Sequence, residues 1–386
     1  MWVSVVGCKH PMWVICPNVS SRPPWWVGGT RAVKVLLLQP DRAVRVRGIV
    51  GPELAFMPGM SLLITTVLAL NLATPAAGVQ ERHAARWSHM YHLADVNGTL
   101  PTSWAAITYD SAAGELFAID TAQRSVRIFG SKGMQTFRFG DDDALGTASA
   151  LAPMANGDLI VIAMNKGKHE ILRCNFRGKK IHAIKLSDIP APVAKDFRAD
   201  RVVVRYNKLY FADTSRMRVV VTTAKGQHLR SYDLAIMLNL DARKREETGI
   251  TGFNVDHAEN LLFTIQPLFM GFVVSPEGKL KGFGSKGSRP GKFNIIGGIA
   301  SDEAGNTYVT DMLRGVVLVF DQHLRFRGEF GSEIEGFRSP RYVAAGNGKV
   351  FVSLGARRGI ATFRVSVSPL DKPKKQLAIN GVLRKL

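Results

Sequence analysis

The sequence predicts an all-β protein, a six-bladed β-propeller of four-stranded antiparallel blades that is closed by pairing an N-terminal strand with the last blade. Two observations support this prediction. Six segments repeat one order of short apolar strands and turn residues, and a spare strand precedes the first of them. Their second strands are expected to begin at residues 116, 159, 209, 262, 307 and 350. A spacing of roughly 40 to 50 residues with four strands per unit is typical of propeller blades.

The clearest repeat spans residues 293–331. Short runs of apolar or alternating residues are separated there by Asp, Gly and Asn, which favour turns. This pattern predicts four antiparallel strands joined by tight turns. The expected strands are residues 298–301, 307–310, 316–320 and 324–330.

Five further segments follow the same plan with different fidelity. The copies at residues 105–140 and 209–221 are close to the first. The copies at residues 159–174, 262–274 and 350–364 are weaker but keep the second and third strands. Each unit therefore supplies the central pair of strands that a ring of equivalent blades needs.

The two ends of the repeat array complement each other. The last unit, which ends near residue 367, has only three good strands, and a spare strand at residues 86–95 precedes the first unit. Pairing the two completes the sixth blade and removes an open sheet edge, which would otherwise promote aggregation. An open sheet or a pair of sandwiches is the alternative architecture.

The repeat at residues 293–331 resembles the NHL repeat family. It contains the turn Asp302-Glu-Ala-Gly-Asn306, then Tyr308-Val-Thr-Asp311, Arg314, the strand Val-Val-Leu-Val-Phe and Phe330-Gly331 in that order. The preceding link, residues 287–293, fits the Gly-x-x-x-Gly-x-Phe pattern of that family. The resemblance covers about residues 86–367 and is degraded in the second, fourth and sixth units. It implies a six-bladed propeller.

The chain has 51 Lys and Arg against 31 Asp and Glu, a formal net charge of +20. Such a surface attracts polyanions in a salt-dependent way. Turns between second and third strands emerge on one face of a propeller, and here they are rich in cations. We expect these side chains to form a basic face that holds an acidic protein or polysaccharide; a basic surface without a partner is the alternative. The residues are Arg124, Lys166, Lys168, Arg216, Arg218, Arg314, Arg357 and Arg358.

The family resemblance also implies ion pairs on this face. It suggests that Asp120, Asp213 and Asp311 neutralise the arginines that follow them. The expected pairs join these carboxylates to Arg124, Arg218 and Arg314, respectively. Such pairs contribute little stability but reduce the positive field, and they would leave five cations free.

The fourth unit interrupts this pattern of charge. Its turn contains Leu268, Phe269 and Met270 where the family has Asp and Arg. These side chains could form an apolar contact patch for a partner, or they could fold back under a neighbouring loop. The insertion at residues 234–240 has the spacing of a short amphipathic helix and could supply that cover.

The ends of the chain are expected to lie outside the ring. Residues 57–78 have an apolar centre followed by small residues, which predicts a signal peptide and an exported protein, periplasmic or extracellular. Residues 1–56 are either an extension upstream of the true start codon or a disordered leader; an uncleaved anchor is a further alternative. We assign the propeller to residues 79–370 and a basic tail to residues 371–386. Cleavage would leave Cys174 as a single, buried structural thiol.

The sequence offers little for catalysis. We expect no cofactor and no metal, because no two histidines have a zinc-ligand spacing on the innermost strands. Arg205 and Asn254 are the only polar residues expected to face the channel. A monomeric binding scaffold without a membrane span is thus the favoured function. The alternatives are a metal-dependent propeller lyase or lactonase and a nucleic-acid-binding NHL propeller, although the rim lacks the interleaved aromatic residues that stack on bases.

Overall fold

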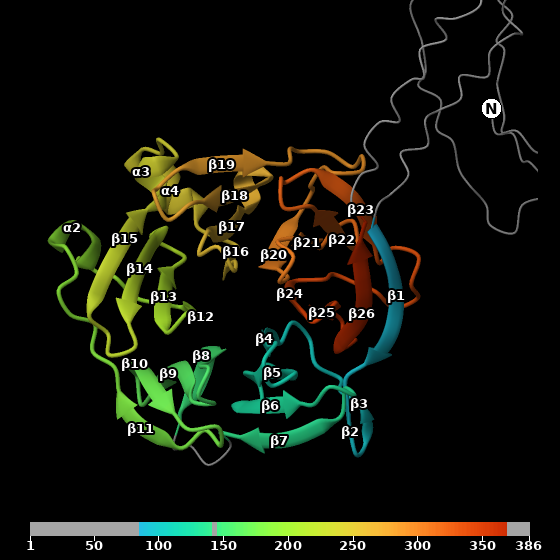
Figure 1. The fold of residues 1–386 in the computed structure, drawn as a ribbon, viewed down its shortest axis with the longest axis horizontal. Helices are drawn as coiled ribbons and strands as arrows, with labels where there is room; N and C mark the ends of the chain where they lie inside the picture. The colour runs from blue at the N-terminus through green and yellow to red at the C-terminus, as the bar shows by residue number, and fades with distance from the viewer. Residues whose placement is uncertain (1–84, 141–144, 369–386) are drawn as a thin grey trace, which may run out of the picture. The chain divides into compact units, whose positions relative to one another are not determined.

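The protein is a six-bladed β-propeller with four antiparallel strands in each blade (Figure 1), as predicted. The computed structural model describes residues 85–140 and 145–368. The predicted leader, signal peptide and basic tail therefore lie outside the described residues. Within the two described ranges, no helix is long and apolar enough to cross a membrane.

Five blades are formed by consecutive strands. Blades 1 and 2 contain β4 (Ala106–Asp110), β5 (Glu115–Asp120), β6 (Ser125–Phe129), β7 (Gln135–Phe139), β8 (Thr147–Pro153), β9 (Leu159–Asn165), β10 (Lys168–Cys174) and β11 (Lys180–Ala183). Blades 3 and 4 contain β12 (Arg201–Arg205), β13 (Lys208–Asp213), β14 (Arg218–Thr223), β15 (His228–Asp233), β16 (Gly252–Val255), β17 (Leu261–Ile265), β18 (Met270–Val274) and β19 (Leu280–Phe283). Blade 5 contains β20 (Ile296–Ser301), β21 (Thr307–Asp311), β22 (Val316–Phe320) and β23 (Phe326–Phe330).

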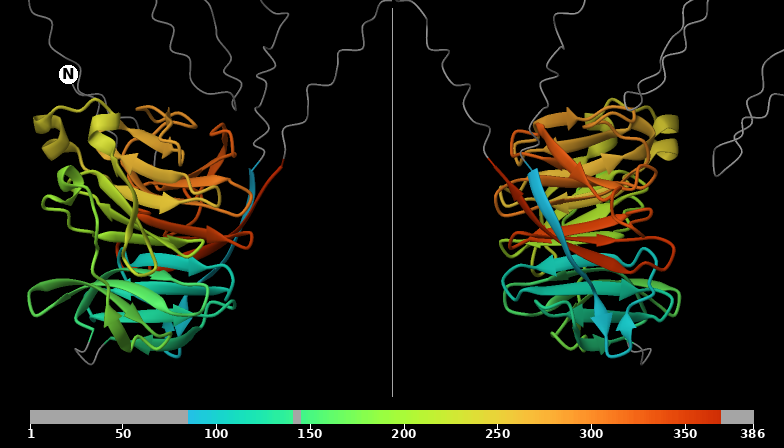
Figure 2. Two further views of the ribbon diagram at one scale, coloured as in Figure 1. Left: turned by 60° about the vertical axis from the view of Figure 1, so that its left-hand side comes forward. Right: turned by 90° about the vertical axis from the view of Figure 1, so that its right-hand side faces the viewer.

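The sixth blade closes the ring in the predicted way. Its sheet has the order β1-β26-β25-β24, in which β1 (Ala85–His92) pairs with β26 (Ile360–Val367), and β25 (Lys349–Ser353) and β24 (Tyr342–Gly346) follow. Figure 2 shows β1 running along β26 at the outside of the ring. The residues just after β1 form a hairpin of β2 (Ala94–Asp95) and β3 (Gly98–Thr99).

The central strands agree with the repeat pattern to within one residue, because they begin at residues 115, 159, 208, 261, 307 and 349. These strands are buried on both faces between neighbouring blades. In β21 and β22, all ten residues are buried. The apolar runs in the sequence thus correspond to sheets that pack against a blade on either side.

The blades approach closely around the central axis. In blade 4, the Thr264 hydroxyl donates to the carbonyl of Gly297 in blade 5 at 2.6 Å. A Cβ atom at Gly297 would lie 2.4 Å from the hydroxyl of Thr310 and 2.9 Å from the carbonyl oxygen of Arg341. A side chain at this position would therefore force blades 5 and 6 apart.

The meander divides the molecule into two faces. The link face contains the turns between second and third strands and the links between blades. The opposite face contains the other turns of each blade. Short helices belong to the links: α2 (Ala191–Ala194) precedes blade 3, while α3 (Leu234–Met237) and α4 (Ala242–Thr248) precede blade 4 (Figure 1). The predicted insertion helix at residues 234–240 is thus present as the shorter α3.

Candidate functional site

The eight cations predicted for the basic face all lie in or beside turns of the link face. Their environments differ, however. The side chains of Arg124, Lys166, Lys168, Arg357 and Arg358 are exposed, whereas Arg216, Arg218 and Arg314 are partly buried.

Two of the three ion pairs that the resemblance implied are replaced by others. Arg218 pairs with Asp233 at 3.6 Å and donates to the carbonyl of Lys195 at 2.7 Å. Arg314 forms its ion pair with Glu329, and its side chain is 11% exposed. Both partners lie on the fourth strand of the same blade. These arginines therefore join inter-blade links to outer strands.

The aspartates that end the second strands of blades 3 and 5 have a different role from the expected one. Asp311 is fully buried and accepts hydrogen bonds from the backbone N–H groups of Asn294, Ile295, Leu313 and Arg314, at 2.6 to 3.2 Å. Asp213 likewise accepts from the N–H groups of Arg198 and Arg216, and it also pairs with the Arg216 side chain at 3.6 Å. Each carboxylate joins an inter-blade link to a turn of the same blade.

The apolar turn of blade 4 is partly covered. Phe269 and Met270 are half-buried: Phe269 packs beside the core of blade 5, and Met270 packs with the core that includes α3. Leu268, in the 3₁₀ turn η1 (Gln266–Leu268), is 37% exposed. Most of this turn therefore folds back, and one leucine remains at the surface.

Between β19 and β26, the links and turns of the link face contain seven exposed cations, which we call the cationic arc. None of its seven members makes an ion pair within the described ranges, and two exposed carboxylates, Glu333 and Glu335, lie among them. The arc consists of Lys286, Arg289, Lys292, Arg338, Arg341, Arg357 and Arg358. Only the last two belong to the predicted set; the others lie in inter-blade links.

Two members of the arc lie over aromatic rings. Lys286 is 4.9 Å from the centroid of Phe269, and Arg341 is 5.5 Å from those of Trp104 and Tyr342. The Trp104 indole N–H donates to the carbonyl of Ser339 at 2.9 Å, which fixes the ring. Aromatic residues thus lie beside two cations of this face, each with a cation over its ring. Such contacts orient a cation while leaving its charge available.

The channel is more polar than the innermost strands indicated. A cavity of about 440 Å³ runs along these strands, and Arg205 and Asn254 line it as predicted. Tyr109, Tyr206 and His257 line it as well. Tyr109 lies near the end of β4, and Tyr206 and His257 lie in the turns that follow β12 and β16. They lie outside the innermost strands that were expected from the sequence, so they were not predicted to line the channel.

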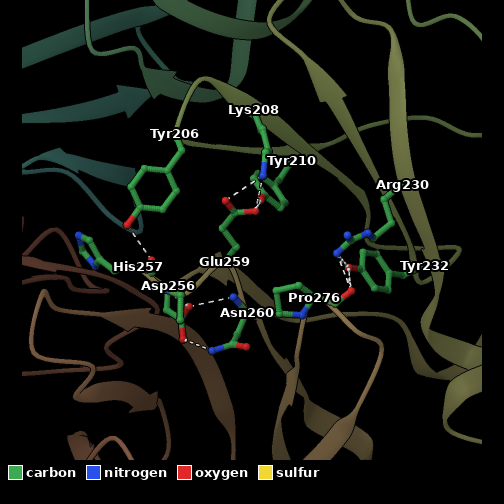
Figure 3. Close-up of polar contacts among 11 residues, drawn as sticks. Tyr206, Lys208, Tyr210, Arg230, Tyr232, Asp256, His257, Glu259, Asn260 and Pro276 are labelled. Carbon is green, nitrogen blue, oxygen red and sulfur yellow. Dashed lines mark hydrogen bonds and ion pairs between the residues drawn. The ribbon is translucent and has the colours of Figure 1, made fainter.

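A second polar cluster joins blades 3 and 4 on the opposite face (Figure 3). Lys208 donates to both carboxylate oxygens of Glu259, at 2.7 and 2.9 Å, and the Tyr210 hydroxyl donates to Glu259 at 2.8 Å. Nearby, Arg230 and Tyr232 both donate to the carbonyl of Pro276. The hydrogen bond from Lys208 lowers the pKa of Glu259, whereas burial and Glu259 raise that of Tyr210. The cluster is internally satisfied, which indicates a structural joint.

This joint predicts a pH-dependent contribution to stability. Because the pKa of Glu259 is below its ordinary value of 4.5 in the folded state, its contribution is fully present above that value and is lost as the pH falls through the folded pKa. Glu259→Gln should lower the free energy of unfolding by about 1 kcal/mol or less at pH 7, because Lys208 is partly solvated. The deficit should shrink in acid.

Urea denaturation from pH 7 to pH 3 measures this difference. Glu246→Gln, at an exposed site in α4, is the control for loss of a negative charge. A deficit for Glu259→Gln that stays constant with pH would contradict the assignment.

Two further kinds of chemistry-bearing group are possible metal ligands and the cysteine thiol. In residues 85–140 and 145–368, no group of three or more His, Cys, Asp and Glu side chains is placed to hold a metal ion. Cys174 is fully buried in β10, and burial raises the pKa of its thiol to about 11. It is thus a structural thiol, as predicted, because the thiolate is the reactive form.

No protein-family model and no curated protein matches the chain. Among solved structures, a protein of unknown function from Bacteroides thetaiotaomicron gives a TM-score of 0.51 at 14% identity, over 73% of this chain and 76% of that one. Virginiamycin B lyase from Staphylococcus aureus, in a catalytically inactive form with quinupristin, gives 0.47 at 13% identity, over 70% and 84%. Hydrazine synthase from Kuenenia stuttgartiensis gives 0.47 at 12% identity, over 70% and 97%. At such identity the first likeness shows the fold alone, so the NHL family remains a resemblance.

Proposed function

We propose that this propeller is an exported, non-catalytic binding scaffold whose cationic arc holds an acidic macromolecule, a protein or a polysaccharide of the cell envelope. The observation that supports the proposal most is the exposure of seven cations on one side of one face with no ion pair among the described residues. Unpaired cations on one face give it a positive potential, which attracts a polyanion.

Rigidity supports the same function. The links that bear the arc are held at fixed points: Asp311 fixes the link that contains Lys292, and Arg314 donates to the Lys292 carbonyl at 3.0 Å. The N–H of Arg357 donates to the Ser103 hydroxyl at 2.7 Å. Backbones held in this way lose little conformational entropy on binding, which favours affinity.

The test is a charge reversal confined to one face. Replacing Lys286, Arg289, Arg357 and Arg358 by Glu should weaken binding to immobilised heparin, used as a model polyanion, by about tenfold or more. The matched control replaces four exposed lysines on the opposite face by Glu, namely Lys132, Lys179, Lys225 and Lys279. The two variants have the same net charge, so equal weakening in both would refute a face-specific site.

A further inference from the structure

The central cavity has a lining that is mostly apolar but contains one arginine at each end. The six innermost strands contribute Ile107, Leu151, Val203, Phe253, Ile299 and Val343 to its wall. Arg201 lies at the end of β12 near the link face, and Arg205 lies at the other end of the same strand. Arg201 is 3.9 Å from the carboxylate of Asp200. Arg205, at the opposite-face end, lacks such a partner among the described residues.

The guanidinium of Arg205 has no carboxylate within ion-pair distance among the described residues. Its Nε donates to the carbonyl of Val255 at 3.0 Å, and burial lowers the pKa of the side chain. Asp256 and Glu303 act on it only at longer range, and both accept hydrogen bonds from backbone N–H groups elsewhere. Asp110, which lines the cavity in blade 1, accepts from its own turn. Removing a cation from water costs free energy, and a bound anion offsets this cost.

Further donors without good acceptors lie at the same end of the channel. Ser301, the last residue of β20, is 3% exposed and lines the cavity, and its hydroxyl has no hydrogen-bond partner. The amide nitrogen of Asn254, near the end of β16, makes only a long contact of 3.4 Å to the carbonyl of Ile299. Blades 3, 4 and 5 thus each place one polar side chain in the lining of this part of the channel. Such convergence of a few polar groups in an apolar cavity is typical of small-molecule sites.

The charges favour a singly charged ligand. Arg205 is the only cation that lines this end of the described channel, and the fields of Asp256 and Glu303 oppose a second negative charge. The wall along Ile107, Val203 and Phe253 suits the apolar part of a small ligand. We propose that the opposite-face end of the channel binds the carboxylate of a small organic acid, with the carboxylate on Arg205 and the apolar part of the acid along the channel.

The experiment measures the melting temperature of the full chain with hexanoate and phenylacetate, with the matching neutral amides, and with inorganic phosphate. At about ten times its dissociation constant, a carboxylate should raise the melting temperature by about 3 °C. The amides and phosphate should not. In Arg205→Gln this shift should vanish, whereas Arg201→Gln, at the other end of β12, should retain it.

Arg205→Gln is expected to fold without ligand, with a melting temperature at or above that of the native chain, because it removes a desolvated charge without a partner. Its loss of response therefore reports on binding rather than on misfolding. Shifts that are equal for acids and amides would overturn the proposal. So would shifts unchanged in Arg205→Gln, a response to phosphate alone, or no response to either acid.

Discussion

A chain that begins at Leu93, and therefore lacks β1, is expected to lose its cooperative thermal transition. β1 pairs with β26 at seven positions, and Trp87 on β1 stacks against Phe330 of blade 5 with ring centroids 5.9 Å apart. Without β1 the sixth blade has three strands and an open edge. The loss should approach the whole free energy of unfolding of an ordinary domain, about 5–15 kcal/mol. Differential scanning calorimetry measures it.

The control for this deletion is a chain that begins at Val79, which retains β1 and should melt cooperatively at the temperature of the full chain. If the chain from Leu93 melted at that same temperature, ring closure by β1 would contribute nothing to stability. Aggregation of the shorter chain alone would agree with an exposed edge, so the calorimetry is done at several protein concentrations.

Asp311→Ala is expected to lower the free energy of unfolding by about 3–5 kcal/mol, because four backbone N–H groups lose their acceptor at once in a buried site. Asp311→Asn keeps one acceptor oxygen and should lower it by about half as much. Urea denaturation gives both values. The loss should be accompanied by faster proteolysis of the link at residues 284–295, which Asp311 fixes.

Asp110→Ala provides a matched comparison. Asp110 also accepts two backbone N–H groups of its turn, those of Ala112 and Ala113, but water can reach this turn and replace it. Its replacement should lower the free energy of unfolding by about 1 kcal/mol or less. If both replacements lowered the free energy of unfolding equally, burial of Asp311 would not explain its contribution to stability.

The sequence predicted the architecture well because local patterns determine it. Turn residues such as Asp302 and Asn306 mark the ends of strands, and the apolar runs between them are long enough for one strand each. Even the closing strand could be predicted, since a strand with no partner and a blade with three strands fit together. The second strands begin within one residue of the expected positions, whereas the closing strand ends at His92 and is followed by the hairpin of β2 and β3, which was not expected.

The contacts of the candidate site could not be predicted to the same extent. Whether Arg218 meets Asp213 or Asp233 depends on the register of the fourth strand, which the repeat pattern does not specify. The link cations of the arc, such as Arg341, become neighbours only when links far apart in the sequence meet on one face. Tyr206 and His257 reach the channel because turns bend over it, and turn geometry is not visible in strand periodicity.

The two proposed sites lie on different parts of the propeller and are independent of each other. The arc is a surface of exposed cations on the link face, suited to a long polyanion. The channel site is enclosed and has one cation, Arg205, suited to a small acid. A ligand in the channel is therefore not expected to change polyanion binding on the link face. Substitutions can remove either site and leave the other in place.

The salt dependence of polyanion binding tests the central claim most directly. The logarithm of the binding constant for heparin should fall linearly with the logarithm of the salt concentration, with a slope set by the number of cations that contact the polymer. Charge reversal of Lys286, Arg289, Arg357 and Arg358 should make this slope shallower by about 3. The opposite-face variant should change it by about 1 or less. Equal slopes in the two variants would contradict the assignment of binding to the cationic arc.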